Sequence, residues 1–143
     1  MMCVAIRDVT SSGASDDTTT SRRLAVVVSF DIDGTLERGD PPGPIPMEQI
    51  REIQSIGLIV GSASDQTKSE QIQMWAASKI EPAFIGHKHH LAEVATRFPS
   101  HRLIHIGDTD VDAHFAALAG FDFFFAKDVP SLDVILAEYV QSG

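Results

Sequence analysis

Two short acidic stretches are the first candidates for chemistry. Asp31 and Asp33 lie in the stretch FDIDGTL, and Asp108 and Asp112 lie further along the chain in GDTDVD. Two carboxylates as close as Asp31 and Asp33 repel each other unless a cation or a proton separates them. Clustered carboxylates favour divalent cations, and Mg²⁺ suits a set of oxygen ligands.

The chemistry that these residues predict is phosphoryl transfer. A phosphate monoester is a dianion that a bare carboxylate cannot easily approach, and a metal ion held by Asp31 and Asp108 would remove that repulsion. A carboxylate nucleophile forms an aspartyl-phosphate, which divides one difficult step into two easier ones. A second carboxyl group nearby would protonate the leaving oxygen and later take a proton from water.

The elements that must position these residues follow from the hydrophobic pattern, in which apolar runs alternate with helix-like stretches from Arg22 onward. We expect strands at 24–30, 57–60, 83–85, 103–106 and 121–125, and helices at 47–55, 68–78, 90–98, 112–119 and 132–140. Nearly continuous apolar strands are typical of sheets covered on both faces. The alternation predicts βαβ units, and therefore a three-layer, Rossmann-like α/β fold with a mostly five-stranded parallel sheet.

Polar residues follow four of the five expected strands. Asp31 follows the first strand, Ser62 and Ser64 the second, Lys88 the third and Asp108 the fourth. Ligands of open parallel sheets bind at the carboxyl ends of the strands. We therefore expect these side chains to meet at one edge of the sheet.

In this order and spacing, the motifs resemble those of the haloacid dehalogenase-like (HAD) hydrolase superfamily, over about residues 24 to 140. FDIDGTL matches the first family motif, D-x-D-G-T, and LIVGSAS resembles the second, a Ser or Thr at a strand end. Lys88 fits the third motif, and GDTDVD fits the fourth, G-D-x-x-x-D.

The resemblance implies a role for each matching carboxylate. Asp31 would be the nucleophile, and Asp33 would be the general acid and base and would offer its backbone carbonyl to the metal. Asp108 would be a direct Mg²⁺ ligand, and Asp112 would support the metal shell.

The remaining motif residues would hold the phosphoryl group. By resemblance, Ser62 and Lys88 would bind the phosphoryl oxygens, with Ser64 as a less favoured register for the serine, and Lys88 would also restrain Asp31. Together these roles predict a magnesium-dependent phosphatase. A phosphotransferase or mutase on the same machinery and a non-catalytic binding module with the HAD fold are the alternatives.

The gaps between the motifs leave no room for the cap domain that many members of this superfamily carry. Only residues 37–46 separate the first motif from the next expected helix, and four prolines make this segment stiff. It could be a rigid connector or a flap over the site. Capless members tend to act on large substrates or to cover their sites by forming oligomers, so a homo-oligomer is one expectation.

Composition limits partners and location. The net charge of −9 argues against nucleic acid or an anionic membrane as a partner. No apolar run reaches the length of a membrane span, the N-terminal residues lack a signal-peptide core, and the single Cys3 allows no internal disulfide. We expect a cytoplasmic protein whose partner is a phosphorylated substrate of a kind that the sequence does not specify.

Two further segments complete the expectations. Residues 1–21 are rich in Ser, Thr and Asp, which predicts a flexible tail before a hydrolase domain at 22–143. The spacing of His87, His89 and His90 matches no common zinc pattern, so we favour a substrate contact from His87 or His89 over a metal.

Overall fold

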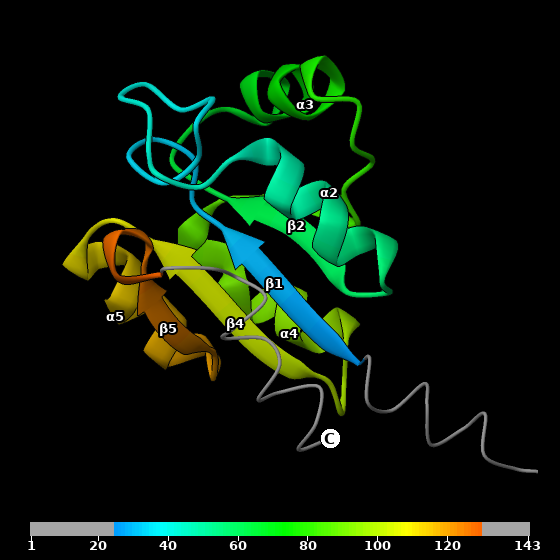
Figure 1. Cartoon of the computed structure of the whole chain (residues 1–143). Coiled ribbons are helices and arrows are strands. Elements are labelled where there is room, and N and C mark those ends of the chain that lie inside the picture. The colour runs from blue at the N-terminus through cyan, green and yellow to red at the C-terminus, as the bar shows by residue number, and fades with distance from the viewer. Residues whose placement is uncertain (1–24, 130–143) are drawn as a thin grey trace, which may run out of the picture.

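The computed structural model describes residues 25–129, and these contain a five-stranded, all-parallel sheet (Figure 1). Its strands are β1 (Val26–Phe30), β2 (Ile59–Ala63), β3 (Phe84–Gly86), β4 (Arg102–Gly107) and β5 (Asp122–Phe125), in the order β3-β2-β1-β4-β5. This arrangement confirms the expected fold class. The expected tail at 1–21 and helix at 132–140 lie outside the described residues.

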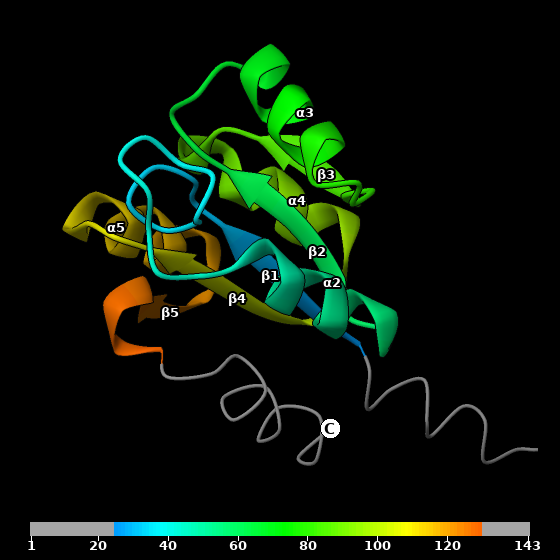
Figure 2. The ribbon, with the colours of Figure 1, turned by 45° about the horizontal axis from the view of Figure 1, so that its top comes forward.

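Helices cover both faces of the sheet. They are α2 (Met47–Ser55), α3 (Lys68–Ala77), α4 (Leu91–Arg97) and α5 (Asp110–Ala119), with short 3₁₀ helices η1 (Lys88–His90) and η2 (Ala126–Asp128). Figures 1 and 2 show α2 on one face of the sheet and α4 on the other. No helix of the described part is long and apolar enough to cross a membrane.

The central strand β1 shows why the chain folds in three layers. All five of its residues are buried, so it must be covered on both sides. Val28 and Phe30 belong to the same core as Ile50 and Ile53 of α2, whereas Val27 belongs to a second core with residues of α4 and α5. Alternation along one strand thus fixes the helices on both faces.

The strand order reverses direction at β1. The chain moves from β1 outward to β2 and β3, and then returns to the other side of β1 to form β4 and β5. The loops after β1 and β4 therefore leave in opposite directions, which opens a crevice at the carboxyl ends of these two strands. In Figure 1 the arrowheads of β1, β2 and β4 point toward this edge, where the loop that follows β1 also lies.

That loop, residues 31–46, contains no additional domain. It folds back on itself through a bridge between Leu36 and Ile45, and Gly34 N donates to Pro41 O over 2.7 Å. Leu36 and Ile45 are buried, so the proline-rich segment is tied to the body of the sheet. The described residues thus contain no cap domain between β1 and α2, as expected.

Candidate active site

A cavity of about 280 Å³ lies at the carboxyl edge of the sheet. Most of the polar residues that were expected to meet there do so, joined by neighbours that the motifs did not single out. Its lining consists of Asp31, Asp33, Ser64, Asp65, Lys88, Asp108, Thr109 and Val111.

Three carboxylates converge beside this cavity. One oxygen each from Asp31, Asp108 and Asp112 lies within 4.8 Å of the others, although these residues come from two different strand ends. The pKa of Asp31 is raised from 3.8 to about 8, first because burial penalises its charged form and then because the charge of Asp112 is close. A side-chain hydrogen bond with Asp108 raises this pKa as well, while Lys88 opposes these effects.

Lys88 supplies the positive charge inside this cluster. It is the first residue of η1 and is 4% exposed, and its Nζ lies 3.1 Å from Asp112 Oδ1 and 3.6 Å from Asp31 Oδ2. Asp65, an exposed residue after β2, lies 3.5 Å from the same Nζ. Burial would lower the pKa of Lys88, but Asp31 and Asp112 raise it, so the ammonium stays charged.

Asp112 is held by a buried hydrogen-bond chain that the motifs did not reveal. His105 Nε2 donates to Asp112 Oδ1 over 3.1 Å, and His105 Nδ1 lies 2.9 Å from Ser29 Oγ. Thr109 Oγ1 donates to Asp112 Oδ2 over 3.0 Å. Burial would raise the pKa of Asp112, yet the bond from His105 and the charge of Lys88 lower it to about 2.

His105 is fully buried in the middle of β4. A histidine in an otherwise apolar strand, two residues before a Gly-Asp pair, is the only sequence signal that could have pointed to it. Its partner Asp112 lies on α5, so the contact appears only once the helix packs against the strand.

Asp33 lies at the mouth of the cavity and is oriented by the loop. Its Oδ1 accepts one hydrogen bond of 2.8 Å from Asp40 N and another of 2.8 Å from Gln66 Nε2. Among the described residues, no hydrogen bond engages the second oxygen, Oδ2.

The glycine of the first acidic motif permits the close approach of the two acidic loops. Gly34 has a φ of +76°, and a Cβ at this position would lie 2.0 Å from Asp108 Oδ2. Any other residue would therefore be strained and would displace the Asp108 carboxylate. Gly34 thus brings the end of β4 against the end of β1.

Ser62 does not line the cavity. The sequence suggested that the second strand ends at Val60, but β2 continues to Ala63, so Ser62 is a strand residue whose side chain faces α3. Its Oγ donates to Gln71 Oε1 over 2.6 Å and accepts from Trp75 Nε1 over 2.9 Å. Ser64, just beyond the strand, lines the cavity instead.

The carboxylate cluster fits a magnesium ion. Its donors are all oxygens, as Mg²⁺ prefers. The hydrogen bond between Asp31 and Asp108 requires a proton between two carboxyl groups, a position that a cation can take over. Both oxygens of Asp112 already accept hydrogen bonds, so this residue is better placed to support the ion than to bind it directly.

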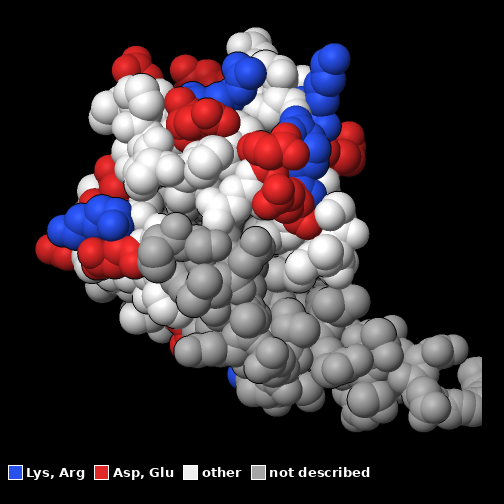
Figure 3. All heavy atoms as spheres, in the orientation of Figure 1, with Lys and Arg blue, Asp and Glu red and all other residues white. Residues whose placement is uncertain are grey.

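A larger, open hollow of about 630 Å³ adjoins the mouth of the cavity. Gln66, which holds Asp33, is part of its lining, together with Glu37, Arg38 and Gly39 of the proline-rich segment and Glu70, Gln73 and Met74. The face of the molecule drawn in Figure 3 carries acidic and basic side chains in mixed groups, without a continuous basic surface.

Comparisons with known proteins do not identify a family. No protein-family model matches the chain, and a search of curated proteins finds no match. The resemblance of the motifs to the HAD superfamily therefore remains a prediction, and the case for an activity rests on the residues of the cavity.

Gly34→Ala is expected to weaken Mg²⁺ binding by about tenfold or more, because the added methyl group displaces Asp108. Gly120→Ala is the matched control: its φ of +82° is similar, but a Cβ there meets nothing within 4 Å. Both variants should lose about 1 kcal/mol of stability from the backbone strain alone. Calorimetric titration with Mg²⁺ measures the affinity of both variants. Equal affinities would contradict the role of Gly34 in positioning Asp108.

The raised pKa of Asp31 predicts a pH-dependent metal affinity. An ion must displace the proton of Asp31, so the apparent Mg²⁺ affinity should rise about tenfold per pH unit up to about pH 8 and then level off. Without metal, the folded state holds a proton that the unfolded chain has released, so stability should fall as the pH rises from about 4 to about 8. Mg²⁺ titrations and thermal melts across this pH range test the two predictions. Asp31→Asn should abolish the pH dependence of both quantities. A Mg²⁺ affinity of the wild type that does not change with pH would contradict the raised pKa of Asp31.

Proposed function

We propose that this protein is a magnesium-dependent phosphatase that hydrolyses a phosphate monoester through an aspartyl-phosphate on Asp31. The observation that carries the proposal is the meeting of Asp31, Asp108 and Asp112, two of which, Asp31 and Asp112, also contact the Lys88 ammonium. The cavity beside them contains Asp33 as well. A structural role alone does not account for this grouping, because Asp31, Asp112 and Lys88 are buried and like carboxylates repel one another at these distances.

The first step is attack by Asp31 on the phosphorus atom. A carboxylate oxygen of Asp31 forms a bond to phosphorus as the bond to the leaving oxygen breaks, and protonated Asp33 gives its proton to that oxygen. Asp31, Asp108 and the backbone carbonyl of Asp33 would hold a Mg²⁺ ion, with support from Asp112, and the ion would supply positive charge for the phosphate. Lys88 and the Ser64 hydroxyl would hold phosphoryl oxygens.

The second step releases phosphate. Asp33, now a carboxylate, takes a proton from a water molecule that attacks the phosphorus of the aspartyl-phosphate, and the bond to Asp31 breaks. Gln66 and the backbone of Asp40 hold Asp33 Oδ1 throughout, so Oδ2 is the atom that carries the proton. This step returns Asp31 to its carboxylate form.

The open mouth of the cavity favours hydrolysis over transfer to another substrate. In the described part of the chain, no cap domain lies between β1 and α2, and the adjoining hollow of about 630 Å³ is wide enough for a leaving group that extends beyond the cavity. A transferase or mutase must exclude water from its intermediate, which an uncovered site does poorly.

Asp31→Asn is expected to lower the rate of monoester hydrolysis by about 1,000-fold or more, because the amide cannot form the acyl phosphate. A panel of phosphate monoesters, assayed with Mg²⁺ and with a chelator, should show turnover only for the wild type with the metal. Activity that survives either the substitution or the chelator contradicts the mechanism. Absence of turnover on every monoester favours a binding module.

The two serines should separate stability from catalysis. Ser62→Ala leaves Gln71 and Trp75 without their buried partner and should cost on the order of 1 to 3 kcal/mol of stability, with kcat/KM of the folded protein little changed. Ser64→Ala should instead lower kcat/KM by about tenfold, because a phosphoryl contact is lost. Denaturant unfolding and steady-state kinetics of both variants provide the measurement, and the reverse pattern would restore the original assignment of Ser62.

A further inference from the structure

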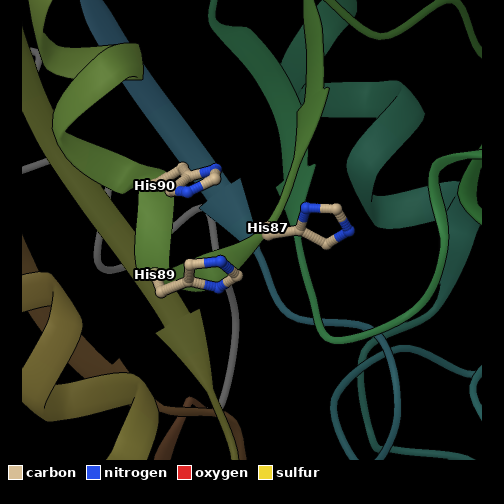
Figure 4. A group of neighbouring side chains, drawn as sticks. All are labelled: His87, His89 and His90. Atoms are coloured by element: carbon tan, nitrogen blue, oxygen red, sulfur yellow. The ribbon is translucent and has the colours of Figure 1, made fainter.

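Three histidine rings gather at the carboxyl end of β3, on the outside of the candidate active site. The ring centroids of His89 and His90 are 4.1 Å apart, and that of His87 is 5.5 Å from His89 and 6.1 Å from His90. One ring nitrogen from each residue lies within 4.8 Å of the other two. Figure 4 shows the rings of His89 and His90 one above the other, with the ring of His87 to one side.

The local backbone explains why residues without a common zinc spacing come together. His87 precedes η1 and His90 ends it, and His90 N donates to His87 O over 2.9 Å. In a 3₁₀ helix, side chains three residues apart lie above one another on the same face. The short helix thus brings His87 and His90 together, an arrangement that spacing rules based on longer loops do not describe.

The side chain of Lys88 points away from those of the three histidines on this turn. Its ammonium points inward to Asp31 and Asp112, whereas His89 and His90 are exposed and His87 is half-buried. The imidazoles are therefore not part of the carboxylate cluster. Their exposure also leaves the rings free to rotate toward a common point.

We propose that His87, His89 and His90 form a binding site for a divalent transition-metal ion such as Zn²⁺, with one ring nitrogen from each as ligand. Imidazole is a preferred ligand of Zn²⁺, Ni²⁺ and Cu²⁺, whereas Mg²⁺ selects the oxygen cluster. Tetrahedral zinc needs its ligand nitrogens about 3.3 Å apart. The three ring nitrogens lie within 4.8 Å of one another, so side-chain rotation must bring them closer together. Three protein ligands leave a coordination position for water or an external ligand.

A neighbouring carboxylate supports such a site. Glu93 Oε2 lies 3.8 Å from His90 Nδ1. Metal-bound imidazoles commonly donate their second ring nitrogen to a carboxylate, which fixes the ring and its tautomer. Glu93 is placed to do this for His90, which would then bind the ion through Nε2.

The site goes beyond the proposed phosphatase and does not depend on it. A bound ion would join residues on both sides of Lys88, so it would fix the turn that carries this lysine into the cavity. Binding can be measured with the ion alone, without any substrate.

The experiment is a calorimetric titration of the untagged, full-length chain with Zn²⁺ in the presence of excess Mg²⁺, which occupies the carboxylates. Wild type should bind one equivalent, and His87→Asn, His89→Asn and His90→Asn should each weaken the affinity by about 10- to 100-fold or more. Substitution of Co²⁺ should produce visible absorption bands that the same three variants lose. Far-ultraviolet circular dichroism checks that each variant is folded.

Three controls distinguish this site from others in the chain. His114→Asn removes an exposed histidine whose ring contacts Phe115, as does that of His89, and it should leave the affinity unchanged. Asp31→Asn and Cys3→Ser, which removes the only thiol, should also leave it unchanged. Loss of binding in any of these controls, or affinities unaffected by one or more of the three histidine substitutions, would overturn a three-histidine site.

Discussion

The repulsion between Asp31 and Asp112 is the constraint on which this edge of the structure depends. Both carboxylates are buried beside one cavity, where charges interact more strongly than in water. Lys88 contacts both. Burial and the charge of Asp112 raise the pKa of Asp31 to about 8, whereas the hydrogen bond from His105 and the charge of Lys88 overcome burial and lower the pKa of Asp112 to about 2. His105 and Lys88 hold Asp112 ionised, so Asp31 is the carboxylate that carries the proton, and a bound cation would take the place of that proton. The carboxylate cluster thus favours the binding of a cation.

The sheet makes this arrangement rigid. Asp31 and Asp108 follow neighbouring parallel strands that pair over their whole length, so their positions are fixed by the ladder and not by flexible loops. Gly34 then allows the two loops to touch, and the fully buried His105, between Ser29 on β1 and Asp112 on α5, connects strand and helix. Under the proposed function, preorganised charge of this kind would act on a substrate without first having to rearrange.

The turn after β3 serves two environments at once. Lys88 points inward to the carboxylates, while the histidines on either side of it point outward and offer nitrogen ligands. A hard cation such as Mg²⁺ and a borderline cation such as Zn²⁺ would therefore select different sides of the same turn. The proline-rich loop plays a comparable double role, since it holds Asp33 through Asp40 and also lines the larger hollow.

The sequence by itself determined the order of the strands and helices, the parallel sheet and the grouping of Asp31, Asp33, Lys88 and Asp108 at one edge. These features follow from the apolar runs, which are local in the sequence. They also follow from the rule that the carboxyl ends of parallel strands lie at the same edge of the sheet, which depends only on topology. Only the tertiary structure shows that Ser64 and not Ser62 lines the cavity, because the end of β2 depends on pairing with β3 and not on the apolar run alone. The contact of His105 with Asp112 was also visible only in the folded chain, because it forms when α5 packs against β4. The meeting of the three histidines was visible only there as well, because it depends on a 3₁₀ turn whose type the sequence does not specify.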